Sequence, residues 1–281
     1  MCGASEKREK EGEQMGYMLE IHSACKCFGR GTVNEHKALE KVDLFLAPGD
    51  FVTVLGSNGA GKSTLFNAIC GNFLLDSGQI CLDGADITFM PEYKRSLKIG
   101  RLFQDPMRGT APSLSIQENL ALAYSKQKKR SFSLALTRKD REYFRQELAR
   151  FDMGLEDRME TRVGLLSGGQ RQVVTLLMST LVPPKLLLLD EHTAALDPAT
   201  ARKVMAIAHQ IVERSQITTM MITHDMQQAL ETGNRTIMLD GGGVLFDMDQ
   251  ETRKDLTVDR LLDMYSEKKK ARFSNDRSLL V

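Results

Sequence analysis

The feature that most constrains the fold is a glycine-rich segment that lies between a short apolar run and a helical pattern. Residues 51–55 (FVTVL) are apolar and β-branched, which is typical of a buried parallel strand. Residues 62–70 carry apolar side chains at helical spacing and are followed by Gly71. The residues between them, 56–63, match the pattern G-x-x-x-x-G-K-[ST]. A strand, a glycine-rich turn and a helix in this order predict a loop that binds phosphate groups.

The chemistry expected of this loop is that of a nucleotide site. Its glycines let the backbone wrap closely around an anion, so that N–H groups and the start of the helix point at phosphate oxygens. Lys62 is placed to reach the β- and γ-phosphates, and the Ser63 hydroxyl is placed to ligate Mg²⁺. A glycine-rich turn with a helix cap is the alternative, and the flanking strand and helix favour nucleotide binding over it. The expected nucleotide-binding residues of the loop are Gly56, Ser57, Asn58, Gly59, Ala60, Gly61, Lys62, Ser63 and Thr64.

A second apolar strand pattern ends in two carboxylates. Residues 186–189 are four leucines, and Asp190 and Glu191 follow them. In a chain with a phosphate loop, an Asp at such a strand end is expected to hold Mg²⁺. Glu191 would then act on the attacking water as a general base. Without the loop upstream, a strand that runs out into a polar turn would be the preferred interpretation.

Strand and helix patterns alternate along most of the chain, which predicts a mostly parallel sheet covered by helices. Residues 18–28 and 38–46 have strand patterns, and residues 78–87 have the pattern of a hairpin. Residues 115–182 carry helical periods, and the alternation returns after the Pro-Pro pair that follows. We therefore predict one α/β domain with a helical subdomain inserted at about residues 106–183. Beyond it, the expected elements are strands at 186–189, 217–223 and 236–239 and helices at 199–213, 227–232 and 258–265.

Composition excludes several classes of protein. Lys and Arg total 38 against 37 Asp and Glu, and this balance argues against a protein that mainly binds nucleic acid non-specifically. The five cysteines include no C-x-x-C pair, which favours reduced thiols over a disulfide framework. No run of 18 apolar residues is present, and the first residues lack the apolar segment of a signal peptide. A soluble intracellular protein is expected, whose membrane role, if it has one, comes through a partner.

The segment LSGGQ at residues 166–170 precedes the helical pattern of residues 171–181. A Ser and two glycines before a helix form a second anion-binding site, which two facing copies would use by completing each other's triphosphate site. A simple N-cap is the alternative, and it explains Ser167 but not the whole pentapeptide. With this segment the sequence resembles the ATP-binding cassette (ABC) ATPase family from about Met18 to Tyr265. The resemblance implies an ABC-type P-loop nucleotide hydrolase with a mostly parallel core sheet, an antiparallel β-subdomain and an inserted helical subdomain.

Other motifs of the family occur in the family's order. The resemblance implies that Gln104 senses Mg²⁺ and the attacking water and couples to the membrane partner, and that Asp197 lies at the dimer interface. It also implies that His224 contacts the γ-phosphate and that Phe28 stacks on adenine, although Phe28 has an apolar strand end as its alternative role. The implied cofactors are ATP and Mg²⁺. The implied catalytic residues are Glu191, His224, Gln104 and Lys62, the metal ligands Ser63, Gln104 and Asp190, and the nucleotide contacts outside the loop Phe28, Ser167, Gly168, Gly169, Gln170 and Asp197.

Two details lie outside this pattern. The family usually has Pro after the catalytic Glu, and this chain has His192, which we interpret as the marker of a subgroup. No second His or Cys lies near His192 in sequence to support a metal role. Cys25 and Cys27 alternate along a strand pattern, so both are expected to face one side and to pack in the core.

The resemblance implies the energy-coupling ATPase of a membrane transporter whose permease is a separate chain. The motif-bearing segments are most similar to ATPases of bacterial uptake systems for amino acids or related small organic solutes. The expected partners are a second copy of the chain, permease subunits and an extracytoplasmic solute-binding protein, with no nucleic acid. The expected location is the cytoplasmic face of the membrane. An exporter ATPase and a soluble ABC protein, such as a cluster-assembly ATPase, are the alternatives.

The two ends and one helix carry further expectations. Residues 1–17 are expected to form a disordered extension, with Met15 and Met18 as alternative starts. Residues 266–281 are expected to form a basic, solvated tail. Residues 120–124 belong either to a permease contact or to the core of the helical subdomain.

Overall fold

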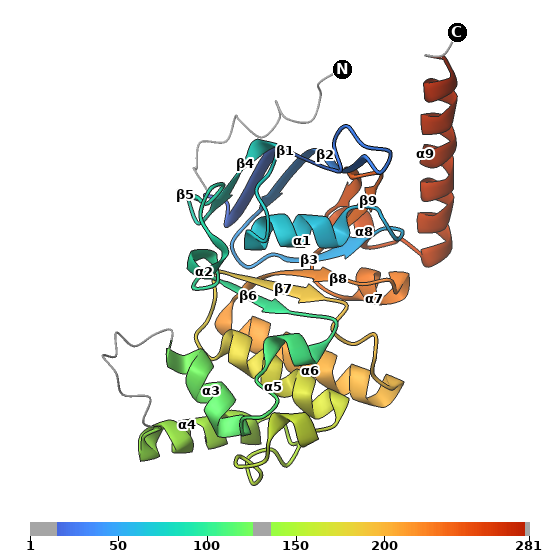
Figure 1. Cartoon of the computed structure of the whole chain (residues 1–281). Helices are drawn as coiled ribbons and strands as arrows, with labels where there is room; N and C mark the ends of the chain where they lie inside the picture. Colours follow the sequence, from blue (N-terminus) through green and yellow to red (C-terminus); the bar gives the residue numbers. More distant parts are fainter. Residues whose placement is uncertain (1–15, 126–135, 279–281) are drawn as a thin grey trace.

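The computed structural model describes residues 16–125 and 136–278, and two β-sheets organise this part of the chain (Figure 1). Most of the expected N-terminal extension, including Met15, lies outside the described residues, as do the last three residues of the expected tail. Within the described ranges, no helix has both the length and the apolar character that crossing a bilayer requires.

The larger sheet has the strand order β10-β9-β3-β8-β7-β6, and all of its pairs are parallel except β9 with β10. Strands β3, β7 and β8 are buried along almost their whole length, which explains their continuous apolar sequences. Because these strands are parallel, their carboxyl ends meet at one edge, where ligands bind in sheets of this kind. The strands are β3 (Phe51–Leu55), β6 (Ile99–Leu102), β7 (Leu186–Asp190), β8 (Thr218–Ile222), β9 (Arg235–Asp240) and β10 (Gly243–Met248).

The smaller sheet is antiparallel, with the order β2-β1-β4-β5, and it lies above helix α1 (Lys62–Cys70) in Figure 1. Its strands are β1 (Leu19–Phe28), β2 (His36–Leu46), β4 (Ser77–Leu82) and β5 (Ala85–Asp86). The helix buries Leu65, Phe66 and Ile69 in one apolar cluster with residues of both sheets. The predicted hairpin at residues 78–87 is confirmed as β4 and β5.

Strand β1 is irregular, which corrects one expectation. Ser23 has a φ of 47°, and the pairing of β1 with β2 shifts register three times between Ile21 and Cys27. Such irregularities break the simple alternation of side chains along a strand. Cys25 and Cys27 are therefore only half-buried, and the expectation that both pack in the core is wrong.

A second apolar core lies among the helices below the large sheet in Figure 1. Phe144 and Leu148 of α4 pack there with Leu120 of α3 and with residues of α5 and α6. These helices are α3 (Ile116–Tyr124), α4 (Arg138–Ala149), α5 (Gly168–Thr180) and α6 (Pro198–Ser215), which confirms the predicted helical periods. Within the run at residues 120–124, Leu120 and Ala123 are buried, whereas Leu122 is 44% exposed, and a permease contact of this run stays a prediction.

The C-terminal part differs from the expected tail. Helix α9 (Val258–Ser278) was predicted to end near residue 265, but it continues through most of the basic segment. That segment has no Gly or Pro to stop a helix and is rich in residues with high helix propensity. Lys268 also ties the helix to β10, because its Nζ donates to Leu245 O at 2.7 Å and lies 4.4 Å from the centre of the Phe246 ring. The short helices that complete the described part are α2 (Glu92–Arg95), η1 (Pro106–Gly109), η3 (Val163–Leu165), α7 (Met226–Glu231) and α8 (Gln250–Arg253).

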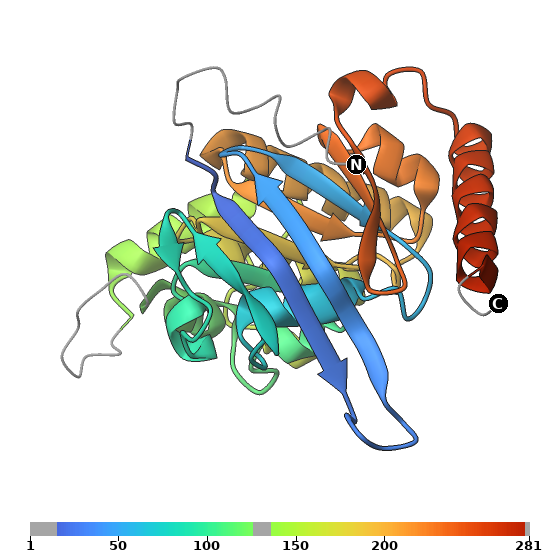
Figure 2. The ribbon, with the colours of Figure 1, turned by 90° about the horizontal axis from the view of Figure 1, so that it is seen from above.

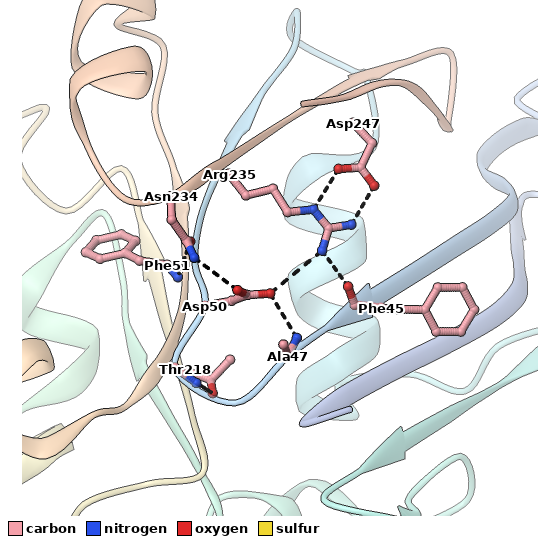
Figure 3. Close-up of polar contacts among 9 residues, drawn as sticks. Phe45, Ala47, Asp50, Phe51, Thr218, Asn234, Arg235 and Asp247 are labelled. Carbon is pink, nitrogen blue, oxygen red and sulfur yellow. Dashed lines mark hydrogen bonds and ion pairs between the residues drawn. The ribbon is translucent and has the colours of Figure 1, made fainter. Parts of the chain in front are cut away.

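A polar cluster joins the two sheets at the start of β9 (Figure 3). The Arg235 guanidinium donates to the Phe45 carbonyl at the end of β2 and to both carboxylate oxygens of Asp247 on β10. Asp50, just before β3, accepts from the Ala47 N–H at 2.8 Å and from the Asn234 amide at 3.1 Å. Seen from above, the long hairpin β1–β2 crosses over the large sheet (Figure 2). The cluster therefore fixes the small sheet over the strand that leads into the phosphate loop.

Candidate nucleotide-binding site

The loop between β3 and α1 has a backbone that requires glycine. Gly56, Gly59 and Gly61 have φ values of 148°, 81° and 102°, a region that other residues rarely adopt. A Cβ atom on Gly56 would lie 2.4 Å from Leu239 O, and one on Gly61 would lie 2.6 Å from Ala38 O. The predicted strand, loop and helix are thus present, and the close approach of neighbouring backbone explains two of the glycines.

Lys62 begins α1 and folds back over the loop. Its Nζ donates to Gly56 O at 2.6 Å and to Ser57 O at 3.1 Å, and the residue is only 5% exposed. Burial lowers the pKa of Lys62, and the Glu191 and Asp190 carboxylates oppose this shift. The first turn of α1 contains no acidic residue, and no side chain of the described residues caps it. The first N–H groups of the helix and a buried ammonium therefore meet at one end of the helix, which suits a phosphate group.

Two predicted catalytic residues meet at the carboxyl edge of the large sheet. Asp190 is the last residue of β7, and Glu191 follows it with a φ of 45°. His224 lies just beyond β8, and its Nε2 is 2.6 Å from Glu191 Oε1. The sequence predicted both side chains near the γ-phosphate, and the structure adds that they contact each other.

Gln104 lies on a neighbouring strand end. Strand β6 stops at Leu102, which pairs in parallel register with Leu189 of β7. The exposed Gln104 thus follows the end of β6 on the side where Asp190 follows Leu189. The sequence did not identify β6 as a strand, because four residues are too few to show a period.

The LSGGQ segment, residues 166–170, is called the signature segment from here on, and it combines a helix cap with a close helix contact. Ser167 caps α5 by accepting from the Gln170 N–H, and Gln170 Oε1 accepts from the Ser167 N–H, both at 3.3 Å. Both Ser167 and Gly168 are exposed. A Cβ atom on Gly169 would lie 2.1 Å from Thr200 Cγ2 on α6, so a glycine lets α6 pack closely. Asp197 in turn caps α6 through the N–H groups of residues 199 and 200.

Among the described residues, no hydrogen bond joins this signature segment to the phosphate loop of the same chain. The adenine-stacking role of Phe28 likewise stays a prediction. Its ring is 40% exposed and lies edge-on to Phe73 at 5.3 Å. The Lys26 ammonium lies 5.6 Å from the centre of the Phe28 ring. The Phe28 ring is therefore packed against Phe73 and Lys26 and is partly exposed to solvent.

His192 is enclosed in the core next to Glu191. It is 2% exposed, and within the described part of the chain neither ring nitrogen has a hydrogen-bond partner. Burial, with a smaller effect of His209, lowers the pKa of His192 from 6.5 to about 4. The imidazole is therefore neutral at pH 7.

The stability of the nucleotide-free protein is expected to fall in acid because of His192. Since its pKa is lower in the folded state, the unfolded chain takes up the proton first as the pH falls below 6.5. The contribution of the neutral His192 to the free energy of unfolding is complete above pH 6.5 and is lost as the pH falls to about 4. The total loss is on the order of 3 kcal/mol. Urea unfolding at several pH values measures this loss. His192→Gln should flatten the pH dependence, and the exposed-histidine control His36→Gln should not; equal slopes in all three proteins would contradict the prediction.

The three residues predicted to bind the metal carry the kind of donor atoms that Mg²⁺ prefers. The Ser63 hydroxyl, the Gln104 amide oxygen and the Asp190 carboxylate are all hard oxygen donors. Across residues 16–125 and 136–278, no cluster of three or more His, Cys, Asp or Glu side chains forms a metal cage. Mg²⁺ usually keeps several waters and binds few protein ligands together with substrate phosphates, so these residues suit it.

The fold and the loop define a nucleotide-binding protein of the P-loop class, with an acidic strand end beside its phosphate site. A family model described as ABC transporter matches residues 39–194, which is more than half of the chain. The chain belongs to the ABC transporter family and is an ATPase.

Individual relatives extend this match over most of the chain. A tyrosine transport ATP-binding protein of Clostridioides difficile (strain R20291) is 42% identical over 248 residues, which cover 88% of this chain and 98% of that protein. A methionine import ATP-binding protein of Vibrio vulnificus (strain YJ016) is 34% identical over 232 residues, which cover 80% of this chain and 63% of that protein. A solved dimeric ATP-binding cassette in a post-hydrolysis state, bound to ADP and Pi, superposes with a TM-score of 0.70 at 27% identity and covers 83% of this chain and 99% of that one.

Proposed function

We propose that this chain powers the uptake of an amino acid or a related small organic solute by a membrane ABC transporter. The observation that carries this proposal is the 42% identity to a tyrosine transport ATP-binding protein over almost the whole of both chains. The similarity to a methionine import ATP-binding protein points to the same class of solute. No finding favours an exporter or a cluster-assembly ATPase.

The active unit of this proposal is a dimer that encloses two ATP molecules. Lys62 and Ser63 of one subunit would hold each nucleotide, and Ser167 and Gly169 of the other would close over its triphosphate. Three features support this arrangement: the exposed Ser167 and Gly168 of the signature segment, the 73% exposed Leu165 beside it, and the dimeric state of similar solved cassettes. An apolar side chain that is exposed next to polar site residues is typical of an interface.

Hydrolysis would depend on the residues at the carboxyl edge of the large sheet. Mg²⁺, held by Ser63, Gln104 and Asp190, would neutralise charge on the β- and γ-phosphates. Glu191 would orient the attacking water and accept its proton. His224, which already contacts Glu191 at 2.6 Å, would hold that carboxylate and contact the γ-phosphate.

The permease contact of this proposal is a groove between the large sheet and the helical part. A cavity of about 330 Å³ opens there, and its lining includes Phe103, Leu122 and Met178. The neighbouring helix α2 and its end expose Tyr93 (68%) and Leu97 (59%). Apolar surface of this kind suits a helix of a permease subunit, which would bring the chain to the cytoplasmic face of the membrane.

Transport in a reconstituted system tests the proposal. The chain would be co-purified with its permease, placed in liposomes with the solute-binding protein outside, and supplied with ATP inside. ATP-dependent accumulation of a labelled amino acid is the expected result. Efflux of the solute instead would show an exporter, and the absence of any co-purifying permease would favour a soluble ABC protein.

A further inference from the structure

Arg101 connects three segments of the candidate site through one side chain. It lies on β6, three residues before Gln104. Its Nη2 donates to Asp190 Oδ2 at 2.9 Å, and its Nη1 donates to Asn67 Oδ1 at 2.7 Å. Asn67 is part of α1, the helix that begins at the phosphate loop. One guanidinium thus links the phosphate-loop helix, the acidic strand end and the strand that leads to Gln104.

The surroundings of Arg101 leave its side chain little freedom. The side chains of Arg101 and Asp190 are only 11% and 13% exposed. The guanidinium carbon lies 4.7 Å from the centre of the Phe103 ring, which stacks against it. Arg101 also pairs with Leu188 in the parallel ladder between β6 and β7. The planar group is therefore held from several sides, and the Asp190 carboxylate that it binds is held with it.

Stability alone is a weak reason for this arrangement. A buried ion pair must repay the desolvation of both charges, and apolar residues of similar volume often stabilise a protein as well. In addition, Arg101 Nε is buried without a hydrogen-bond partner within the described residues. An orphan donor of this kind costs free energy. The contact is better explained by what it does to Asp190.

We propose that Arg101 is a positioning residue, which holds the Asp190 carboxylate in the orientation that receives Mg²⁺. The inference rests on the metal role proposed above for Asp190. Arg101 binds Oδ2, so the carboxylate would keep one orientation, and Oδ1 would remain to serve the metal or its hydration shell. Asn67 holds the guanidinium from its other side. Such pre-organisation reduces the conformational entropy that metal binding would otherwise cost.

A second effect of Arg101 has the opposite sign, and this makes the proposal testable. A positive charge close to Asp190 repels Mg²⁺. If repulsion were its main effect, removal of Arg101 would strengthen Mg²⁺ binding. If Arg101 acts by positioning, its removal weakens Mg²⁺ binding, and a Lys in its place does not restore it, because one ammonium cannot hold two groups in a fixed plane.

The experiment measures binding of a fluorescent ATP analogue with Mg²⁺ and with EDTA, in a Glu191→Gln background that is expected to hydrolyse ATP only slowly. The ratio of the two affinities is the gain due to Mg²⁺. Arg101→Gln is expected to reduce this gain about fivefold, which corresponds to one net hydrogen bond, and to change the affinity in EDTA less than twofold. Arg101→Lys should show a similar loss. An unchanged or increased gain would overturn the proposal.

Three further variants separate the possible causes. Arg108→Gln is the matched control, because Arg108 also lies over the Phe103 ring, at 5.4 Å, and should leave the gain unchanged. Asn67→Ala removes the hydrogen bond that Asn67 accepts from the guanidinium, and it should lower the gain due to Mg²⁺ about twofold. If Arg101→Gln does not fold, Asn67→Ala tests the proposal in its place. Asp190→Asn tests the underlying metal role. If Asp190→Asn keeps the gain, the proposed metal site fails, whereas a loss in Asp190→Asn but not in Arg101→Gln rejects the role of Arg101 alone.

Discussion

Replacement of Glu191 by Gln is expected to slow ATP hydrolysis by about 10²- to 10⁴-fold while ATP affinity stays within about threefold. Gln keeps the shape of the side chain and its place near His224, but its amide cannot accept the proton of the attacking water. The strained φ of 45° at Glu191 and its 2.6 Å contact with His224 Nε2 show that the side chain is held in one position. Single-turnover hydrolysis and a fluorescence titration with ATP measure the two effects.

The same variant is expected to accumulate as an ATP-bound dimer, because the step that would open the dimer is blocked. Size-exclusion chromatography with and without ATP shows this directly. The control is Glu142→Gln, which neutralises an exposed carboxylate on α4 far from the motifs in sequence and should hydrolyse ATP at the unmodified rate. Hydrolysis at that rate in Glu191→Gln would show that another group is the base.

Replacement of Lys62 by Ala is expected to weaken ATP binding about 10- to 100-fold, because it removes a charge-assisted contact with the phosphates. Lys62 Nζ is already placed at the loop, where it donates to Gly56 O and Ser57 O. ATP would replace these carbonyls as the partner of the ammonium. Isothermal titration with ATP measures the loss.

The control for Lys62 is Lys185→Ala, which removes a half-exposed ammonium that pairs with Asp83 at 3.1 Å. It should leave ATP affinity unchanged, since an exposed ion pair of this kind has little effect beyond its own surroundings. Thermal unfolding without nucleotide shows whether Lys62→Ala is folded. A folded Lys62→Ala variant with unchanged ATP affinity would reject the predicted role of the loop.

Much of the fold could be predicted because its core elements carry their own local pattern. The strands at β3, β7 and β8 are uninterrupted apolar runs, and α1 begins at Lys62 and ends before Gly71 as its sequence indicates. Elements without such a pattern were missed, among them β6, β10, α2 and α8. These are short or half-exposed, so that neighbours in space rather than in sequence stabilise them. The end of α9 was misjudged because charged residues can continue a helix as readily as leave it.

The candidate site, like the fold, was predicted only in part. Each motif was visible in the sequence as a set of consecutive residues, and the roles expected of them stay predictions. Their contacts across the sheet were not visible, since Glu191 and His224 come from different strands. Arg101 had no signal at all, because it belongs to no motif and meets Asn67 and Asp190 only after β6 has paired with β7.

The class of fold, the phosphate loop and the family could be recognised from the order of residues alone, because they depend on residues that are adjacent in the chain and on backbone conformations that only glycine adopts readily. The contacts between distant side chains became visible only in the folded chain. Folding paired Glu191 with His224, enclosed His192 without a partner and placed one guanidinium between two motifs. The physical reason is that parallel strands come together through long connections, so the contacts at their ends depend on strand order and register, which a single sequence does not encode locally.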